Sequence, residues 1–314
     1  MKTRRFKQVD VFTSQPYFGN PLAVVLDGSG LDAAAMQRFA HWTNLSETTF
    51  VLPPEDPSAD YNVRIFTPGG ELPFAGHPTL GTCHAWLQAG GQPKRQGVIV
   101  QQCQVGLVPI RLEPHASGVR QAFAAPPLKR SAPSPVVLAQ VAAALGLKAQ
   151  HIVAAQMLDN GPVWLGLLLD SADTVMQIEP DHLALKKMGI KVGVAGAHAA
   201  QEAPVLIARK NREARAFDGS TQPAPAEAAS ADFEVRAFAA TIGINEDPVT
   251  GSLNASLAQW LMADGHASDH YTVAQGTCLG RAGRVHLSRE TMAGTPVVWV
   301  GGESVTCIDG TVTL

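Results

Sequence analysis

Short apolar or alternating segments separated by turn residues dominate the chain, and they predict many short strands with few helices. A helical period follows Asp32, a capping residue, and predicts a helix over 33–43. A second helix is predicted over 78–88, closed by Gly90 and Gly91. The first 115 residues also predict strands over 8–12, 22–26, 46–52, 61–66, 98–102 and 107–112.

The same type of pattern resumes after a Pro-rich stretch at 126–135, the best candidate linker. We therefore expect one half over 1–125 and a second over 126–301, with a final strand, 302–314, that can return to the first half. The second half predicts helices over 136–145 and 180–187, strands over 164–169, 205–208 and 233–238, and a polar, Ala/Pro-rich loop over 219–231.

Two segments, 63–90 and 235–265, repeat one pattern of strand, loop, glycine and helix. The first glycine of each helix and the glycine that ends it are 14 positions apart in both segments, and each helix carries Trp-Leu near its end. This agreement at several levels predicts a duplicated unit. We expect the two leading glycines, Gly76 and Gly251, to face each other across a cleft.

Composition narrows the class of protein. The chain has 314 residues, 16% of them charged, with a net charge of −3, which excludes a generally basic nucleic-acid binder and an acidic disordered chain. The longest apolar stretch near its middle, 163–169, is far shorter than the ~20 residues that a membrane span needs. Four dispersed cysteines without metal-ligand spacing predict reduced thiols, a cytoplasmic location and no metal site.

The two helix starts are candidates for anion binding. A glycine there lets backbone N–H groups approach a ligand, and a helix N-terminus carries unpaired donors and partial positive charge. Two such ends would suit one small carboxylate. His77 and Ser252 follow the two glycines at equivalent positions, and the alternative is that both are plain N-caps without a ligand.

Carboxylates near these turns are candidates for acid–base chemistry. Glu47 opens an apolar strand, where partial desolvation would raise its pKa, although an exposed strand-end charge is the ordinary alternative. Glu71 lies in the loop before the first helix, and Glu246 and Asp247 lie in the equivalent loop of the second half. His266 and His270 have metal-like spacing, but Gly265 breaks the segment and favours a surface loop.

Four ordered motifs make the chain similar to the PhzF family of phenazine-biosynthesis isomerases over essentially its whole length. They are Asn-Leu-Ser-Glu-Thr-Thr-Phe-Val at 44–51, Arg-Ile-Phe-Thr-Pro at 64–68, Glu-Leu-Pro-Phe-Ala-Gly-His-Pro-Thr at 71–79 and Glu-Asp-Pro-Val-Thr-Gly-Ser at 246–252. The resemblance implies a diaminopimelate-epimerase-like α/β fold: two pseudo-symmetric halves, each a curled, mostly antiparallel sheet around a central helix. It also implies a cleft between the halves, no cofactor and a homodimer.

The resemblance also implies roles for individual residues. Glu47 would be the catalytic acid/base, with His77 and Asp247 orienting the substrate or relaying protons. Racemases of the same fold have a cysteine before each helix glycine, where this chain has Ala75 and Thr250, so a paired-thiol mechanism is excluded. Four further residues would line the substrate site: Asn20, Gly76, Gly251 and Ser252.

Together these features predict a cofactor-independent isomerase that relocates a proton on a small carboxylate-bearing substrate, with no nucleic-acid or membrane partner. The family's namesake reaction suggests trans-2,3-dihydro-3-hydroxyanthranilate, an intermediate of phenazine biosynthesis. Two alternatives remain open: an epimerase or racemase that works without thiols, and a non-catalytic small-molecule-binding protein on the same fold.

Overall fold

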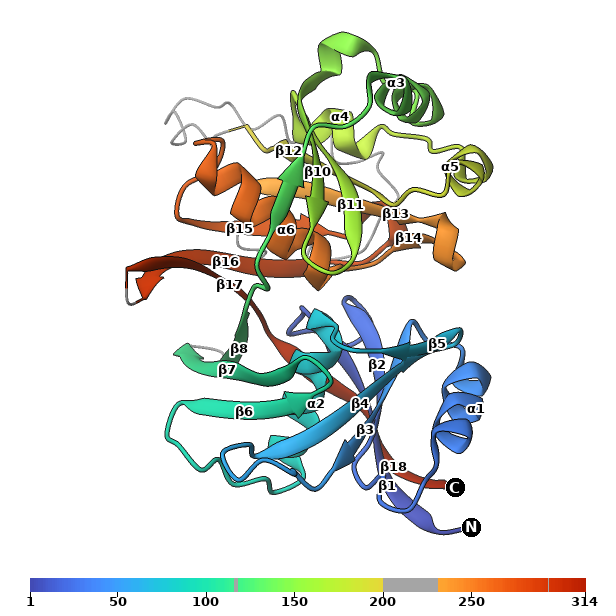
Figure 1. Ribbon diagram of the computed structural model, residues 1–314, viewed down its shortest axis with the longest axis vertical. Helices are drawn as coiled ribbons and strands as arrows, with labels where there is room; N and C mark the ends of the chain where they lie inside the picture. The colour runs from blue at the N-terminus through green and yellow to red at the C-terminus, as the bar shows by residue number, and fades with distance from the viewer. Residues whose placement is uncertain (116–117, 200–230, 293) are drawn as a thin grey trace, which may run out of the picture.

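The computed structural model describes residues 1–115, 118–199, 231–292 and 294–314, and it divides visually into a lower and an upper half (Figure 1). The predicted strand over 205–208 and the predicted loop over 219–231, apart from its last residue, lie outside the described residues. The first half contains β1 (Thr3–Val11), β2 (Asn20–Val25), α1 (Ala33–Thr43), β3 (Glu47–Leu52), β4 (Tyr61–Thr67), β5 (Gly70–Leu72), α2 (Gly76–Gln88), β6 (Val98–Cys103), β7 (Gly106–His115) and β8 (Gly118–Ala124).

The second half repeats this order with two additional helices. It contains β9 (Lys129–Ser131), α3 (Pro135–Ala144), β10 (Ile152–Asp159), β11 (Val163–Leu169), α4 (Ala172–Met176), α5 (His182–Met188), β12 (Val192–Ala197), β13 (Phe233–Ala239), β14 (Ile244–Asp247), α6 (Gly251–Ala263), β15 (His270–Gln275), β16 (Gly283–Met292) and β17 (Thr295–Gly302), followed by β18 (Ser304–Thr313). Single 3-10 turns lie at Ala149–His151, Ala240–Ile242 and Thr277–Leu279.

Strand pairing shows the duplication directly. In the first half β2 pairs in parallel with β3 and β4 pairs in parallel with β6, while β3–β4, β4–β5, β6–β7 and β7–β8 are antiparallel. In the second half β11–β12 and β13–β15 are the parallel pairs, and β12–β13, β13–β14, β15–β16 and β16–β17 are antiparallel. The two mostly antiparallel halves therefore share one topology.

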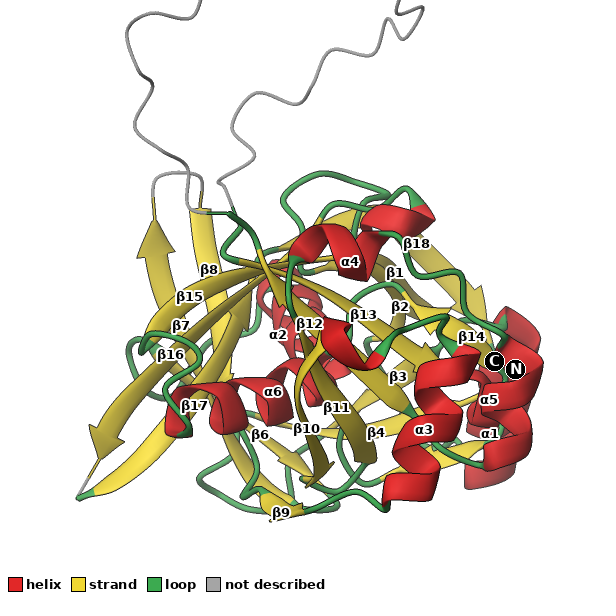
Figure 2. Cartoon of the chain, turned by 90° about the horizontal axis from the view of Figure 1, so that it is seen from above, coloured by secondary structure: helices red, strands yellow, loops and turns green. Residues whose placement is uncertain are grey.

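The sheets of the two halves are connected at two places. β8 pairs with β17, which makes the sheet continuous between them, and β18 returns to pair with β1 along its length. Lys2 and Leu314 are hydrogen-bonded through their backbones, so the two ends of the chain lie together (Figure 1). α3 and α5 pack against each other on the outside of the second half, over a separate apolar cluster (Figure 2).

The helices α2 and α6 are the centres of the two halves. Each has 13 residues, of which nine in α2 and ten in α6 are buried. A helix buried on nearly all sides, with apolar and small residues throughout, is typical of a core element and not of a surface helix.

Several details differ from the sequence expectations. The helix expected over 78–88 begins at Gly76, because Ala75 has extended backbone and its carbonyl accepts from the Thr79 N–H. The helix expected over 180–187 begins after Asp181, whose side chain caps the Ala184 N–H. The helix over 33–43 is confirmed with its Asp32 cap. The pattern predicted no strands at β8, β10, β12 or β15–β17, several of which are rich in Gly, Ala or polar residues.

The starts of α2 and α6 meet at Gly76 and Gly251. A Cβ on Gly76 would lie 3.3 Å from the Gly251 Cα, and a Cβ on Gly251 would lie 3.1 Å from the Gly76 Cα. The two glycines therefore face each other as predicted, but in direct contact and not across an open cleft. Two backbones can approach this closely only where neither carries a side chain.

We expect Gly76→Ala to destabilise the protein by about 1–3 kcal/mol, because its new methyl group would lie 2.6 Å from the Phe123 ring as well as against Gly251. The control is Gly310→Ala on β18, where no other atom lies within 4 Å of the added Cβ. Urea unfolding of both variants measures the difference. Equal stability of the two variants would show that the helix starts are loosely packed.

Candidate active site

Glu47 is the first residue of β3, where it lies beside Leu22 of the parallel neighbour β2. Its side chain is only 14% exposed, and its Oε2 atom lies 3.3 Å from Nε2 of His77, which is 6% exposed. The two atoms are not aligned as a hydrogen bond, and neither has another hydrogen-bond partner among the described residues. Both therefore retain hydrogen-bonding capacity at a buried place, which is typical of groups that act on a ligand.

Asp247 ends β14 and is held by both halves of the molecule. The Asn20 side chain donates to its Oδ1 at 3.0 Å, and the Thr250 hydroxyl donates to its Oδ2 at 2.7 Å. Asn20 is completely buried and also donates to the Val249 carbonyl at 2.8 Å. Asn20 thus fixes the loop before α6 from the opposite half. The substrate contact expected for Asn20 stays a prediction.

Sequence reasoning missed two side-chain amides, those of Gln275 and Asn254, that fix the loop before α6. The Gln275 side chain accepts from the Thr250 N–H at 3.0 Å and donates to the Asp247 carbonyl at 3.1 Å. Asn254, one turn into α6, donates to the Gln275 Oε1 at 2.8 Å. Gln275 lies 25 residues beyond Thr250 in the chain, so only the contacts reveal this clamp.

Burial shifts the pKa values of Glu47, Asp247 and His77 away from their ordinary values. Burial, followed by the nearby Asp247 carboxylate, raises the pKa of Glu47 from 4.5 to about 8. Burial raises the pKa of Asp247 from 3.8 to about 6, against the lowering effect of its bonds from Thr250 and Asn20. Burial also lowers the pKa of His77 to about 3. Near neutral pH the site therefore holds a largely protonated Glu47, an ionised Asp247 and a neutral His77.

The helix starts offer backbone donors to this site. The N-cap positions are Ala75 and Thr250, and neither side chain caps its helix. His77 and Ser252 lie inside the first turns, so the alternative interpretation of both as plain N-caps is wrong. The first N–H groups of a helix have no acceptor within the helix itself, and they favour a carboxylate.

The other candidate acids have structural partners. Glu71 and Glu246 each form a two-bond ion pair with an arginine of the preceding strand, Arg64 and Arg236 respectively. Cys83, the cysteine in α2, is fully buried, and burial raises the pKa of its thiol. It is therefore an inert core residue.

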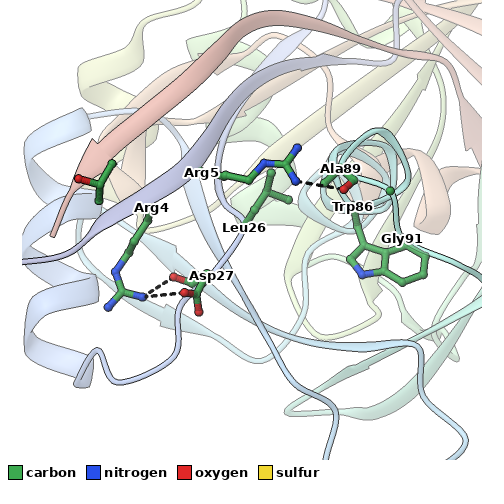
Figure 3. A pocket seen from close by; sticks show the side chains of 9 residues that line it. Arg4, Arg5, Leu26, Asp27, Trp86, Ala89 and Gly91 are labelled. Atoms are coloured by element: carbon green, nitrogen blue, oxygen red, sulfur yellow. Dashed lines mark hydrogen bonds and ion pairs between the residues drawn. The ribbon is translucent and has the colours of Figure 1, made fainter.

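A surface pocket of about 410 Å³ lies at the C-terminal end of α2, where Trp86, Ala89 and Gly91 line it (Figure 3). His77 is in the first turn, at the other end of this helix. The charged groups of the pocket are already engaged: Arg5 donates to the Ala89 carbonyl at 3.0 Å, and Arg4 contacts Asp27. The candidate site residues Glu47, His77 and Asp247 do not line this pocket.

Neither a metal site nor a membrane-spanning helix is present among the described residues. They contain no group of three or more His, Cys, Asp or Glu side chains placed to hold a metal ion, and His266 and His270 form no such site. No described helix is long and apolar enough to cross a membrane.

Comparison with known proteins places the chain in a wide group of relatives. The sequence profile of the PhzC-PhzF family, described as phenazine biosynthesis-like protein, matches residues 9–310. The chain is 33% identical to antisense-enhancing sequence 1 of Schizosaccharomyces pombe over 99% of each chain. It is 32% identical to trans-2,3-dihydro-3-hydroxyanthranilate isomerase of Pseudomonas aeruginosa, over 91% of this chain and 90% of that one. A PhzF-family protein of Bacillus anthracis has the same fold, with a TM-score of 0.80 and 22% identity over the whole of both chains.

We expect Glu47→Gln to stabilise the folded protein increasingly as pH rises. Folded wild type keeps the Glu47 proton up to a pKa of about 8, whereas an unfolded carboxyl loses it near its ordinary value of 4.5. The contribution of Glu47 to the free energy of unfolding therefore falls between pH 4.5 and about pH 8, and it stays low at higher pH. The variant removes this penalty, so the gain should be absent at pH 4 and reach a few kcal/mol at pH 9.

Urea unfolding at a series of pH values measures this difference, with Glu55→Gln at an exposed position as the control. A stability difference that does not grow with pH would show that Glu47 ionises at its ordinary pH in the folded protein.

Proposed function

The chain belongs to the PhzC-PhzF family and is an isomerase of that family, and we propose that it relocates a proton on a small carboxylate-bearing substrate without a cofactor. The single observation that carries this proposal is that two largely buried carboxylates, one from each half, lie within electrostatic range of each other. Glu47 and Asp247 lie close enough for the charge of Asp247 to raise the pKa of Glu47, and they lie beside His77 and the meeting helix starts.

Glu47 is the acid/base in this proposal. A pKa of about 8 makes its carboxylate a stronger base than an ordinary glutamate, while roughly a tenth of it is ionised at pH 7. The carboxylate takes a proton from one carbon of the substrate, and the resulting acid returns a proton to another carbon. Proton count and charge are then unchanged over the cycle.

Asp247 and His77 support this transfer. Asp247 stays ionised at neutral pH and keeps Glu47 basic, and its own oxygens are fixed by Asn20 and Thr250. His77 is neutral and lies 3.3 Å from Glu47, so its ring can orient the Glu47 carboxyl or pass a proton. The N–H groups that follow Gly76 and Gly251, with the Ser252 hydroxyl, would hold the substrate carboxylate.

The substrate that we propose to test first is trans-2,3-dihydro-3-hydroxyanthranilate, since a relative 32% identical to this chain is named for its isomerisation. Another relative, 33% identical, carries the unrelated name antisense-enhancing sequence 1, so a turnover assay is the appropriate test. We also propose a homodimer, which sedimentation measures.

Exchange of substrate hydrogen with solvent deuterium identifies the class of reaction and the residue that acts as the base. We expect the wild-type protein to introduce deuterium from D₂O into the isomerised product, and Glu47→Gln to lower turnover by about 10²–10⁴-fold because Gln cannot exchange a proton. Ser252→Ala is the comparison, since it removes one of several carboxylate donors and should mainly weaken binding, by about 1–2 kcal/mol. Full exchange by Glu47→Gln, with loss in Asp247→Asn or His77→Asn, would assign the base to another residue.

The same assay separates the alternatives. An epimerase would invert one carbon with deuterium uptake and no shift of a double bond. A binding protein would show saturable affinity for the carboxylate without any exchange.

Activity should be unchanged after dialysis against a chelator and after treatment with a thiol-blocking reagent, because the proposed chemistry uses only carboxylates and an imidazole. The measurement is the isomerisation rate before and after each treatment. Loss of rate on chelation, restored by an added divalent metal, would contradict the cofactor-independent mechanism.

A further inference from the structure

Both halves contain the same arginine–glutamate pair at equivalent places. Arg64 on β4 donates to both oxygens of Glu71 on β5, at 2.7 and 2.6 Å, and lies 5.1 Å from the centre of the Phe66 ring. Arg236 on β13 donates to both oxygens of Glu246 on β14, at 2.9 and 2.8 Å, and lies 5.0 Å from the centre of the Phe238 ring. Each pair ties a long strand to the short strand that leads into a central helix.

The two pairs differ in burial. The side chains of Arg64 and Glu71 are 28% and 21% exposed and line a surface hollow, whereas those of Arg236 and Glu246 are 5% and 6% exposed. Arg236 also donates to the carbonyls of Val175 at 3.2 Å and Ile178 at 2.7 Å. The second guanidinium is thus fixed by four contacts, and it presents a rigid, planar fork to Glu246.

Glu246 precedes Asp247 directly, and both belong to β14. Successive side chains of a strand point to opposite faces. With Glu246 held on one face by Arg236, Asp247 is turned to the other face, toward Asn20 and Thr250. We propose that the Arg236–Glu246 pair is a positioning element that sets the orientation of Asp247 for the reaction; this inference rests on the proposed function.

The pair also sets the charge beside Asp247. Glu246 is an added negative charge that raises the pKa of Asp247, after the larger effect of burial. Arg236 is the cation that neutralises Glu246, and the other ionisable groups that act on Arg236 are Glu234 of the same strand and Cys278. Across the site, Glu47 is the carboxylate whose pKa responds to Asp247. In the first half Glu71 precedes no acid, because Leu72 follows it.

Two substitutions separate charge from geometry. Glu246→Gln removes the negative charge and leaves Arg236 unneutralised, so the titration of Asp247 should move to lower pH. Arg236→Lys keeps the positive charge but loses the two-bond fork, so that titration should stay nearly unchanged while kcat falls roughly tenfold or more, with a smaller change in KM. Glu71→Gln and Arg64→Lys are the matched controls, with no effect expected on either quantity.

Asp247 is followed by ¹³C-carboxyl NMR, with its signal assigned by its absence from Asp247→Asn, and kcat and KM come from the isomerisation assay. Folding of each variant is checked by thermal unfolding. A pair that only stabilises the fold would lower the unfolding temperature and leave the Asp247 titration and kcat of the folded fraction as in wild type, which would overturn the proposal. A wild-type protein without any isomerase activity would refute the proposed function instead, while the NMR titration would still test the coupling.

Discussion

The contact between Gly76 and Gly251 is the constraint on which the remaining structure depends. It brings two buried helices end to end, and it fixes how the two halves lie against each other. Glu47 and His77 come from one half and Asp247 from the other, so this approach also decides whether the three groups form one site. A side chain at either glycine would meet the backbone of the other helix start, which disfavours this approach of the two halves.

Bringing the carboxyls of Glu47 and Asp247 together lowers the stability of the folded protein. Burying a carboxyl favours its neutral form, and burying two of like charge side by side disfavours ionisation of both. The two carboxyls differ in their hydrogen bonds. Asp247 receives two hydrogen bonds and ionises first. Glu47 receives none from the described residues and keeps its proton to a higher pH. The inequality gives the two acids different roles within one small site.

Much of this arrangement can be read from the sequence. The cap at Asp32 and the glycines before the central helices follow local rules. The repeated order of strand, loop, glycine and helix predicted the shared topology that strand pairing now shows. The strand β12 was missed because its Gly and Ala residues give no alternation of apolar and polar side chains. The strand β16 does alternate over 283–288, so the local pattern could have indicated it. The bonds from Asn20 to Asp247 and from Gln275 to Thr250 join residues far apart in the chain, so no local pattern could indicate them.

The duplication also explains why the site is asymmetric although the fold is not. Thr48 on β3 pairs with Phe66, and Val192 on β12 pairs with Phe238 at the equivalent place, so the counterpart of Glu47 in the second half is Lys191. The counterpart of Asp247 in the first half is Leu72, because the aligned β4 and β13 residues, Ile65 and Ala237, pair with them. Each acid thus occupies a position that carries no acid in the other half. Two identical halves would instead place two equivalent carboxyls at the helix starts, either two glutamates or two aspartates, and equivalent surroundings would not make one ionise before the other. Divergence after duplication therefore places the two acids in different surroundings, so that Asp247 ionises first and its charge raises the pKa of Glu47.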